Sequence, residues 1–257
     1  MSVISYLERR ASEAVLSTDE NSSISTSIST LQTRLNTYFG SSVSEHFKFG
    51  SQTRGTILPR AMDDHSDVDY MIIFAEGGYT PQTYLDRLKR FVDKYYSSSS
   101  VKQTSPTITL ELNHIKFDLV PALKGYITGV YQIPNGASLW RDTSPNDFNA
   151  TLTAKNNSEL YKIKPTIRLA KFWNAKAGYV YESFSFEKWI VDQSYYAIIN
   201  QRDYLFKVFD ALLLPSDAQW RKDRVQRAKD LVAKVRKYEA DDMPYTAEAE
   251  VKKLIPE

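Results

Sequence analysis

Two aspartates stand one residue apart at the start of an apolar, β-branched run, in the segment Asp67-Val68-Asp69-Tyr70-Met-Ile-Ile-Phe. The run indicates a buried strand. Because side chains alternate along a strand, Asp67 and Asp69 lie on one face, while Val68 and Tyr70 lie on the other. Two neighbouring carboxylates repel each other unless a cation lies between them, so the pair favours a divalent metal site.

A third carboxylate comes from a second predicted strand, Ile-Lys116-Phe-Asp118-Leu-Val120-Pro, in which alternation places Asp118 on one face with Lys116 and Val120. If this strand lies beside the Asp67/Asp69 strand, the three aspartates form a cage. Such a cage holds two Mg²⁺ ions, or Mn²⁺ in their place, about 3.5 to 4 Å apart for phosphoryl transfer.

A Gly-Ser pair precedes the aspartates. Residues 45–49 alternate as a strand does, and Gly50 and Ser51 follow at its end, where backbone amides and a hydroxyl could hold the phosphates of a nucleotide. A second pair, Gly40-Ser41, follows a predicted helix and lies far from the carboxylates in sequence. We therefore interpret Gly40-Ser41 as an ordinary helix end.

Composition restricts the class of protein. The chain has 257 residues, a net charge of +2 and no cysteine, so a large core is expected and disulfides and zinc–thiolate sites are excluded. No apolar run approaches the roughly 20 residues that span a bilayer, which predicts a soluble cytoplasmic protein without a membrane partner. The most basic stretch, residues 219–238, also carries acidic residues, which favours a salt-bridged surface over a nucleic-acid site.

The pattern of apolar residues divides the chain near residue 155. Helices are predicted at 2–17, 21–39 and 81–96, and strands at 45–49, 67–74, within 101–121, at 126–133 and at 137–142. The remainder is predicted to be helical, at 148–157, 160–176, 184–191, 202–213, 219–238 and 245–254. We expect an α/β (α+β) protein with a catalytic lobe of mixed sheet over residues 1–154, including the N-terminal helices, and a helical lobe over residues 155–257.

The motifs Gly50-Ser51, Arg54-Gly-Thr, Ser66-Asp-Val-Asp69 and Phe117-Asp-Leu-Val-Pro121 together resemble the polymerase-β-like nucleotidyltransferase superfamily. Within it, the pattern is most similar to the bacterial CD-NTases, the cyclic-oligonucleotide synthases related to cyclic GMP-AMP synthase and oligoadenylate synthase. The resemblance implies a nucleotide bound in the cleft between a catalytic and a helical lobe. It also implies that Asp67, Asp69 and Asp118 bind metal and carry the catalysis.

The resemblance extends to two stretches of the helical half. Ile-Arg-Leu-Ala-Lys171-Phe-Trp-Asn is similar to the family helix whose lysine contacts the triphosphate, and Glu-Ser183-Phe184-Ser-Phe186-Glu is similar to its Ser-aromatic motif. By this resemblance Lys171 and Ser183 bind phosphate and Phe184 stacks on a base. Two alternatives stay open: Lys171 belongs to a solvated basic face, or Phe184 and Phe186 are core residues.

The expected function is template-independent joining of nucleoside triphosphates into a cyclic or short linear oligonucleotide signal, as in bacterial anti-phage defence. The alternatives are nucleotide addition to an RNA end or to a protein, and a nucleotide-binding pseudoenzyme that regulates a neighbour. The expected partners are nucleoside triphosphates, with room for an effector or regulatory protein; nucleic acid is not indicated.

Overall fold

The computed structural model describes residues 2–125, 130–215 and 217–257. The chain divides into two compact units. One unit contains Ser17–Arg60 and His65–Asn149 and holds the sheet, and the other contains Met1–Leu16, Ala61–Asp64 and Ala150–Glu257 and is helical. The mixed α/β class predicted from the sequence is confirmed.

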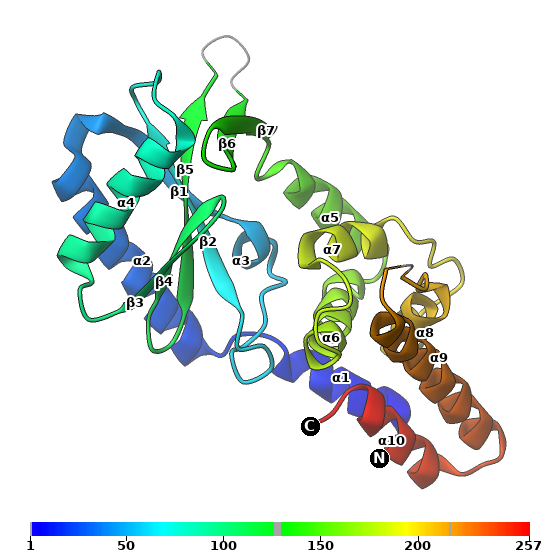
Figure 1. Cartoon of the computed structure of the whole chain (residues 1–257). Coiled ribbons are helices and arrows are strands. Elements are labelled where there is room, and N and C mark those ends of the chain that lie inside the picture. Colours follow the sequence, from blue (N-terminus) through cyan, green and yellow to red (C-terminus); the bar gives the residue numbers. More distant parts are fainter. Residues whose placement is uncertain (1, 126–129, 216) are drawn as a thin grey trace. The chain divides into compact units, whose positions relative to one another are not determined.

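Helix α1 of the helical unit comes first along the chain, followed by the strands and helices of the sheet unit and then by the other helices of the helical unit (Figure 1). In order they are α1 (Val3–Glu13), α2 (Thr18–Phe39), η1 (Gly40–Ser42), β1 (Val43–Phe49), α3 (Gly50–Arg54), β2 (Asp67–Phe74), α4 (Pro81–Tyr95), β3 (Ser100–Thr104), β4 (Thr107–Glu111), β5 (Lys116–Lys124), β6 (Tyr131–Asn135), β7 (Leu139–Thr143), α5 (Asp147–Ser158), α6 (Ile163–Lys176), α7 (Ser183–Val191), α8 (Gln201–Ala211), α9 (Gln219–Ala240) and α10 (Pro244–Leu254).

The sheet has the strand order β1-β2-β5-β4-β3, with β6 and β7 joined to the far end of β5. The central pair, β2 and β5, is parallel, and the other pairs are antiparallel. The predicted strand at 126–133 begins in residues 126–129, outside the described part of the chain, and its second half belongs to β6.

Helices α2 and α4 cover one face of the sheet (Figure 1). On that face the ring of Phe74 meets Phe39 of α2 at 5.4 Å and Tyr84 of α4 at 4.9 Å between centroids. The opposite face carries the aspartates at one end and a small apolar cluster that contains Met71 and Val120. One face therefore supplies the core and the other supplies the site.

The helical unit is built around α6, which packs against α1, α7 and α8. The sequence pattern groups residues 1–16 with the sheet, but α1 packs on α6, α8 and α10. Its Tyr6 hydroxyl donates a hydrogen bond to the carbonyl of Ile255 at 2.6 Å. Apolar residues on one face of a helix indicate that the face is buried, but they do not identify what buries it.

Helix α6 starts at residue 163, three residues later than the apolar spacing predicts. Leu160 and Tyr161 have left-handed backbone angles, φ +53° and +60°, which interrupt a right-handed helix. Asp63 and Asp64 group with the helical unit, where the Tyr179 hydroxyl donates a hydrogen bond to Asp63. Within the described residues, no helix is long and apolar enough to cross a bilayer.

Candidate active site

The three predicted catalytic aspartates lie on the two parallel strands at the centre of the sheet. Asp67 and Asp69 are on β2, Asp118 is on β5, and the strand register pairs Asp69 directly with Asp118. Asp67 is paired with Lys116 in the same register. Residues paired across two strands point to the same face, and so do residues two apart on one strand. The three aspartate side chains therefore share the sheet face that α2 and α4 leave uncovered. The pairing that the sequence analysis requires for a carboxylate cage is therefore present.

Asp118 is held from the neighbouring strand β4. Thr109 is its cross-strand partner, and the Thr109 hydroxyl donates a hydrogen bond of 2.6 Å to the Asp118 carboxylate. Burial raises the pKa of Asp118, and this effect is opposed by the Thr109 hydrogen bond and by the charge of Lys116. A nearby cation would favour the ionised form of this carboxyl group. Thr109 was not singled out from the sequence, although its alternation in 107–111 places it on this face.

The backbone register pairs Asp69 with Asp118, but the side chains of the three aspartates are spread further apart. The carboxylate oxygens of Asp67, Asp69 and Asp118 do not all lie within 4.8 Å of one another. Among the described residues, that spacing is met by Asp63 and Asp64 with the adjoining His65. Asp63 and Asp64 belong to the helical unit and His65 belongs to the sheet unit, so these three residues do not form a site within one unit. The strand-borne aspartates instead have other polar partners, as Thr109 shows for Asp118.

The predicted phosphate loop lies against this cluster. Phe49, the last residue of β1, is paired with Asp69, and Gly50 follows with φ +72° at the start of α3. A Cβ atom built on Gly50 would lie 1.8 Å from Oδ2 of Asp69, so only glycine fits there. The Ser51 carbonyl accepts backbone hydrogen bonds from Thr56 and Ile57, which fixes the turn after α3.

The other Gly-Ser pair behaves as the sequence predicts. Gly40 is the C-cap of α2 with φ +50°, and no atom lies within 4 Å of a Cβ built on it. The two glycines thus share a left-handed backbone but differ in surroundings. Gly50 is packed against an aspartate, and Gly40 faces open space.

The three predicted residues of the helical unit lie on two helices that pack against each other, Lys171 on α6 and Ser183 and Phe184 on α7. The Lys171 ammonium forms a 2.9 Å ion pair with Glu187, and both side chains are buried, with 9% and 1% of their surface exposed. The alternative of a solvated lysine is therefore wrong. Ser183 is exposed in the first turn of α7. Burial acts to raise the pKa of the N-cap residue Glu182, but hydrogen bonds from Ser185 and Phe184, and to a smaller extent the charge of Lys171, lower it.

The two phenylalanines of the Ser-aromatic motif have different environments. Phe184 is 42% exposed, with the Lys188 ammonium 5.9 Å from its ring centroid. Phe186 is 3% exposed and stacks between Tyr181 and Trp189, at centroid distances of 5.0 and 6.0 Å. The core alternative therefore holds for Phe186, whereas the ring of Phe184 is accessible. Glu187, the partner of Lys171, was not identified from the sequence, although it ends the quoted motif.

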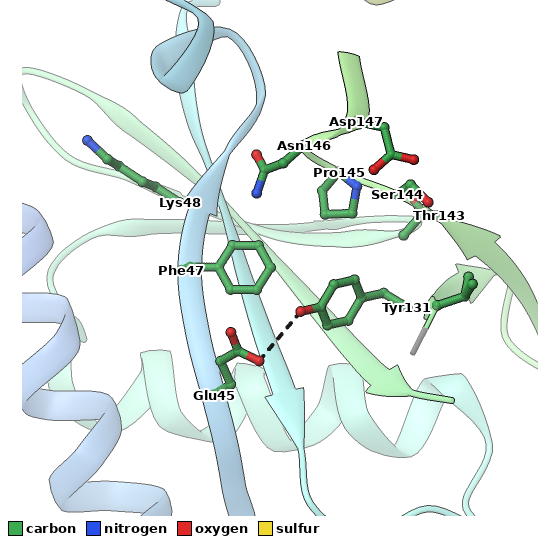
Figure 2. Close-up of a pocket in the computed structure, with 10 residues that line it drawn as sticks. Glu45, Phe47, Lys48, Tyr131, Thr143, Ser144, Pro145, Asn146 and Asp147 are labelled. Carbon is green, nitrogen blue, oxygen red and sulfur yellow. Dashed lines mark hydrogen bonds between the residues drawn. The ribbon is translucent and has the colours of Figure 1, made fainter. Parts of the chain in front are cut away.

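A pocket of about 510 Å³ opens on the aspartate-bearing face of the sheet unit (Figure 2). Phe47 and Glu45 of β1 form one side, and the segment that leads from β7 into α5 forms the other. Tyr131 of β6 closes the pocket between them, with its ring 5.6 Å from that of Phe47. The sequence contained no motif for this pocket, because its walls come from segments about 80 to 100 residues apart.

A mixed sheet with register-paired aspartates on two parallel strands, preceded by a glycine turn, defines a nucleotidyltransferase of the polymerase-β-like class. The model of one family, described as the Second Messenger Oligonucleotide or Dinucleotide Synthetase domain, matches residues 1–156. The match covers more than half of the chain, and the chain belongs to this family. The resemblance inferred from the motifs is confirmed.

One curated protein also matches part of the chain. A probable cyclic nucleotide synthase of Bacillus cereus (strain VD146) is 26% identical over 182 residues, which are 56% of this chain and 54% of that protein. The match thus spans about half the length of this curated relative.

Among solved structures, CdnC of E. coli MS115-1 with ATP matches with a TM-score of 0.73 at 17% identity, covering 100% of this chain and 98% of that one. The same protein in complex with HORMA-deltaN matches with a TM-score of 0.70 at 17% identity, over 98% and 96% of the two chains. The CD-NTase CdnG of Bradyrhizobium diazoefficiens with GTP matches with a TM-score of 0.71 at 12% identity, over 97% of each chain. At these identities the likeness shows a shared fold.

Proposed function

We propose that the protein is a template-independent nucleotidyltransferase that joins nucleoside triphosphates into a cyclic or short linear oligonucleotide signal and releases pyrophosphate. Membership of a family of second-messenger synthetase domains supports this reaction. The observation that supports the assignment of the site is the close approach of Asp69, the register partner of Asp118, to Gly50 of the proposed phosphate loop.

The aspartates fit divalent metal ions, Mg²⁺ or Mn²⁺. All three offer carboxylate oxygens, which hard cations prefer. Burial raises the pKa of Asp118, so a bound cation would stabilise the ionised form of this carboxyl group. Asp67 and Asp69 would hold both ions, and Asp118 would hold the ion nearest the acceptor hydroxyl. When bound, such ions lower the pKa of the attacking hydroxyl and stabilise the leaving pyrophosphate.

The remaining residues bind and orient the nucleotide. The Gly50 and Ser51 amides, with the Ser51 hydroxyl, would hold the triphosphate, because glycine lets the backbone approach closely. From the helical unit, Lys171 would supply a positive charge and Ser183 a hydroxyl for phosphate. The accessible Phe184 ring would stack on a base. Lys171 reaches phosphate only by leaving, or sharing, its ion pair with Glu187.

The two Gly-Ser pairs provide a matched test of the phosphate loop. Gly50→Ala should abolish nucleotide incorporation, because the added Cβ displaces the Asp69 carboxylate. Gly40→Ala should retain activity and lose only about 1 kcal/mol of stability, since its left-handed backbone disfavours a side chain. Ser51→Ala, which leaves the backbone unstrained, should raise the KM for nucleotide, and Ser41→Ala should not. Equal effects of the two pairs on nucleotide incorporation would show that the wrong pair was assigned.

The same assay separates the proposed reaction from its rivals. Labelled nucleoside triphosphates without any acceptor should yield a phosphatase-resistant product if the enzyme makes a cyclic signal. Product that appears only after RNA or a protein is added would favour the tailing or protein-modifying alternative. Nucleotide binding without product would favour a pseudoenzyme.

We extend the proposal to the setting of the reaction. A nucleotide signal made in the cytoplasm for anti-phage defence would need a controlling input. The complex of the E. coli relative with a HORMA protein supports a regulatory protein partner. We do not propose a nucleic-acid partner, because some basic side chains of α9 pair with acidic ones, as in Arg221–Asp217 and Arg236–Asp210.

A further inference from the structure

The pocket of Figure 2 has one apolar side and one polar side. The Phe47 ring projects into it from β1, and Pro145 lies across from the ring. Asn146 and Asp147 stand on the polar side at the start of α5. A flat heterocycle fits between an aromatic ring and a proline, because aromatic faces stack on any base. Polar groups at the edge of such a slot select among heterocycles.

The charges of the pocket argue against phosphate. Glu45 and Asp147 contribute two carboxylates to the lining, and Glu45 also pairs with Lys124 at 3.7 Å. Lys48 contributes the one ammonium of the lining, and its side chain extends away from the other lining residues. Like charges repel, so a triphosphate is disfavoured where an uncharged base is accepted. Only the base of a nucleotide is therefore expected to enter.

Besides the hydroxyls of Thr143 and Ser144, and Glu45 with its Tyr131 partner, the pocket offers an amide on Asn146 and a carboxylate on the next residue, Asp147. The Oδ1 atom of Asn146 accepts a hydrogen bond from the Asn149 amide at 3.1 Å, which leaves the Asn146 amide group to donate. The Asp147 side chain is exposed and lines the pocket, so its carboxylate can accept hydrogen bonds from a ligand. Guanine presents the complementary edge, an O6 acceptor beside the N1–H and N2–H donors. Adenine would turn its N1 lone pair toward the carboxylate.

The position of the pocket decides which nucleotide it serves. Along β1, Phe47 is the next residue on the same face as Phe49, which is paired with Asp69, so the pocket begins about 7 Å along the strand from the aspartates. That separation suits a nucleoside with its base in the pocket and its ribose hydroxyl near Asp118. Gly50 and Ser51 lie at the opposite end of β1, beyond Phe49. A nucleotide in the pocket thus approaches from the side away from the phosphate loop, as the acceptor.

We propose that this pocket binds the guanine base of the acceptor nucleotide, with Phe47 as the stacking surface and Asp147 as the acceptor for N1–H and N2–H. The inference rests on the proposed function. In the reaction, the acceptor hydroxyl loses its proton and its oxygen bonds to the α-phosphorus of the donor. The bond from that phosphorus to the bridging oxygen breaks, and pyrophosphate leaves. Asp147 selects the base and takes no part in these bond changes.

α,β-Methylene analogues of GTP and ATP isolate the acceptor role. The methylene bridge prevents the analogue from donating its own nucleotidyl group, while its ribose hydroxyls can still be extended by ordinary ATP. The wild-type protein should extend methylene-GTP on the order of 10- to 100-fold more efficiently than methylene-ATP, the range expected for one good bidentate contact. Asp147→Asn should reduce this ratio to within a few-fold. Asp142→Asn, an exposed aspartate on β7 outside the pocket, should preserve it.

A wild-type preference for methylene-ATP, or an unchanged ratio in Asp147→Asn, would overturn the inference and leave the proposed function standing. No product from any nucleotide would instead refute the proposed function. In that event, direct titration with methylene-GTP decides the pocket. Weaker binding by Asp147→Asn than by Asp142→Asn supports it, and equal binding overturns it. Thermal melts of both variants control for folding.

Discussion

Phe184 and Phe186 are two residues apart on α7, and their substitution tests whether the helical unit contributes a base-binding surface. Full burial of a phenylalanine is worth about 1.5 to 3 kcal/mol. Because 42% of Phe184 is exposed, Phe184→Ala should lower the free energy of unfolding by only about 1 to 2 kcal/mol. Phe186 is 3% exposed between two aromatic rings, so Phe186→Ala should cost about 3 to 5 kcal/mol.

Binding should follow the opposite order in the folded fraction. Loss of a stacking ring weakens binding by about 1 to 3 kcal/mol, so Phe184→Ala should raise the dissociation constant for nucleotide, while Phe184→Tyr should retain binding. Urea unfolding and nucleotide titration of each variant give the two quantities. An unchanged affinity in Phe184→Ala, or a stability loss equal to that of Phe186→Ala, would refute the stacking role.

Three further predictions concern charged groups. Asp118→Asn should abolish incorporation without loss of stability at neutral pH. Since burial raises the pKa of Asp118 above 3.8, this group's stabilising contribution falls as the pH rises through its folded pKa, and the Asn variant should lack that slope. Lys171→Ala should cost about 3 to 5 kcal/mol by leaving Glu187 buried and unpaired, whereas the double variant Lys171→Met/Glu187→Leu should be close to neutral in urea unfolding; equal losses would contradict a buried ion pair. Burial lowers the pKa of His46 below 6.5, so stability should fall as the pH drops from 6.5 through the folded pKa, and His46→Gln should flatten that slope between pH 8 and 5.

The strand-borne part of the site could be predicted because it follows from local alternation. A period of two is enough to place Asp67 with Asp69 and to orient Asp118, and a glycine at the end of a strand is visible in the sequence. The parallel pairing of β2 with β5 cannot be read locally, because it joins segments about 50 residues apart. The motif resemblance provided that pairing, and the register confirms it.

Other features depend on tertiary contacts that no local pattern encodes. The basic residues of 160–176 suggest a solvated face, yet Lys171 is buried because Glu187 arrives from α7 to pair with it. Phe184 and Phe186 are indistinguishable by residue type, and the way α7 packs decides which one is exposed. The short helix α3 could not be predicted from the sequence, since its five residues are too few for a periodic signal.

The bond between Tyr6 and Ile255 has a consequence for biosynthesis. The segment that carries α1 leaves the ribosome before the sheet unit, but α10, one of its packing partners, is made near the end of this chain. Residues 17–149 contain every strand that the structure describes, and they can therefore fold during translation before the apolar face of α1 makes its final contacts. Domains that complete early fold as units, whereas contacts of high sequence separation form late. We expect the sheet to fold first and the helical unit last, although α1, which is made before the sheet, belongs to the helical unit.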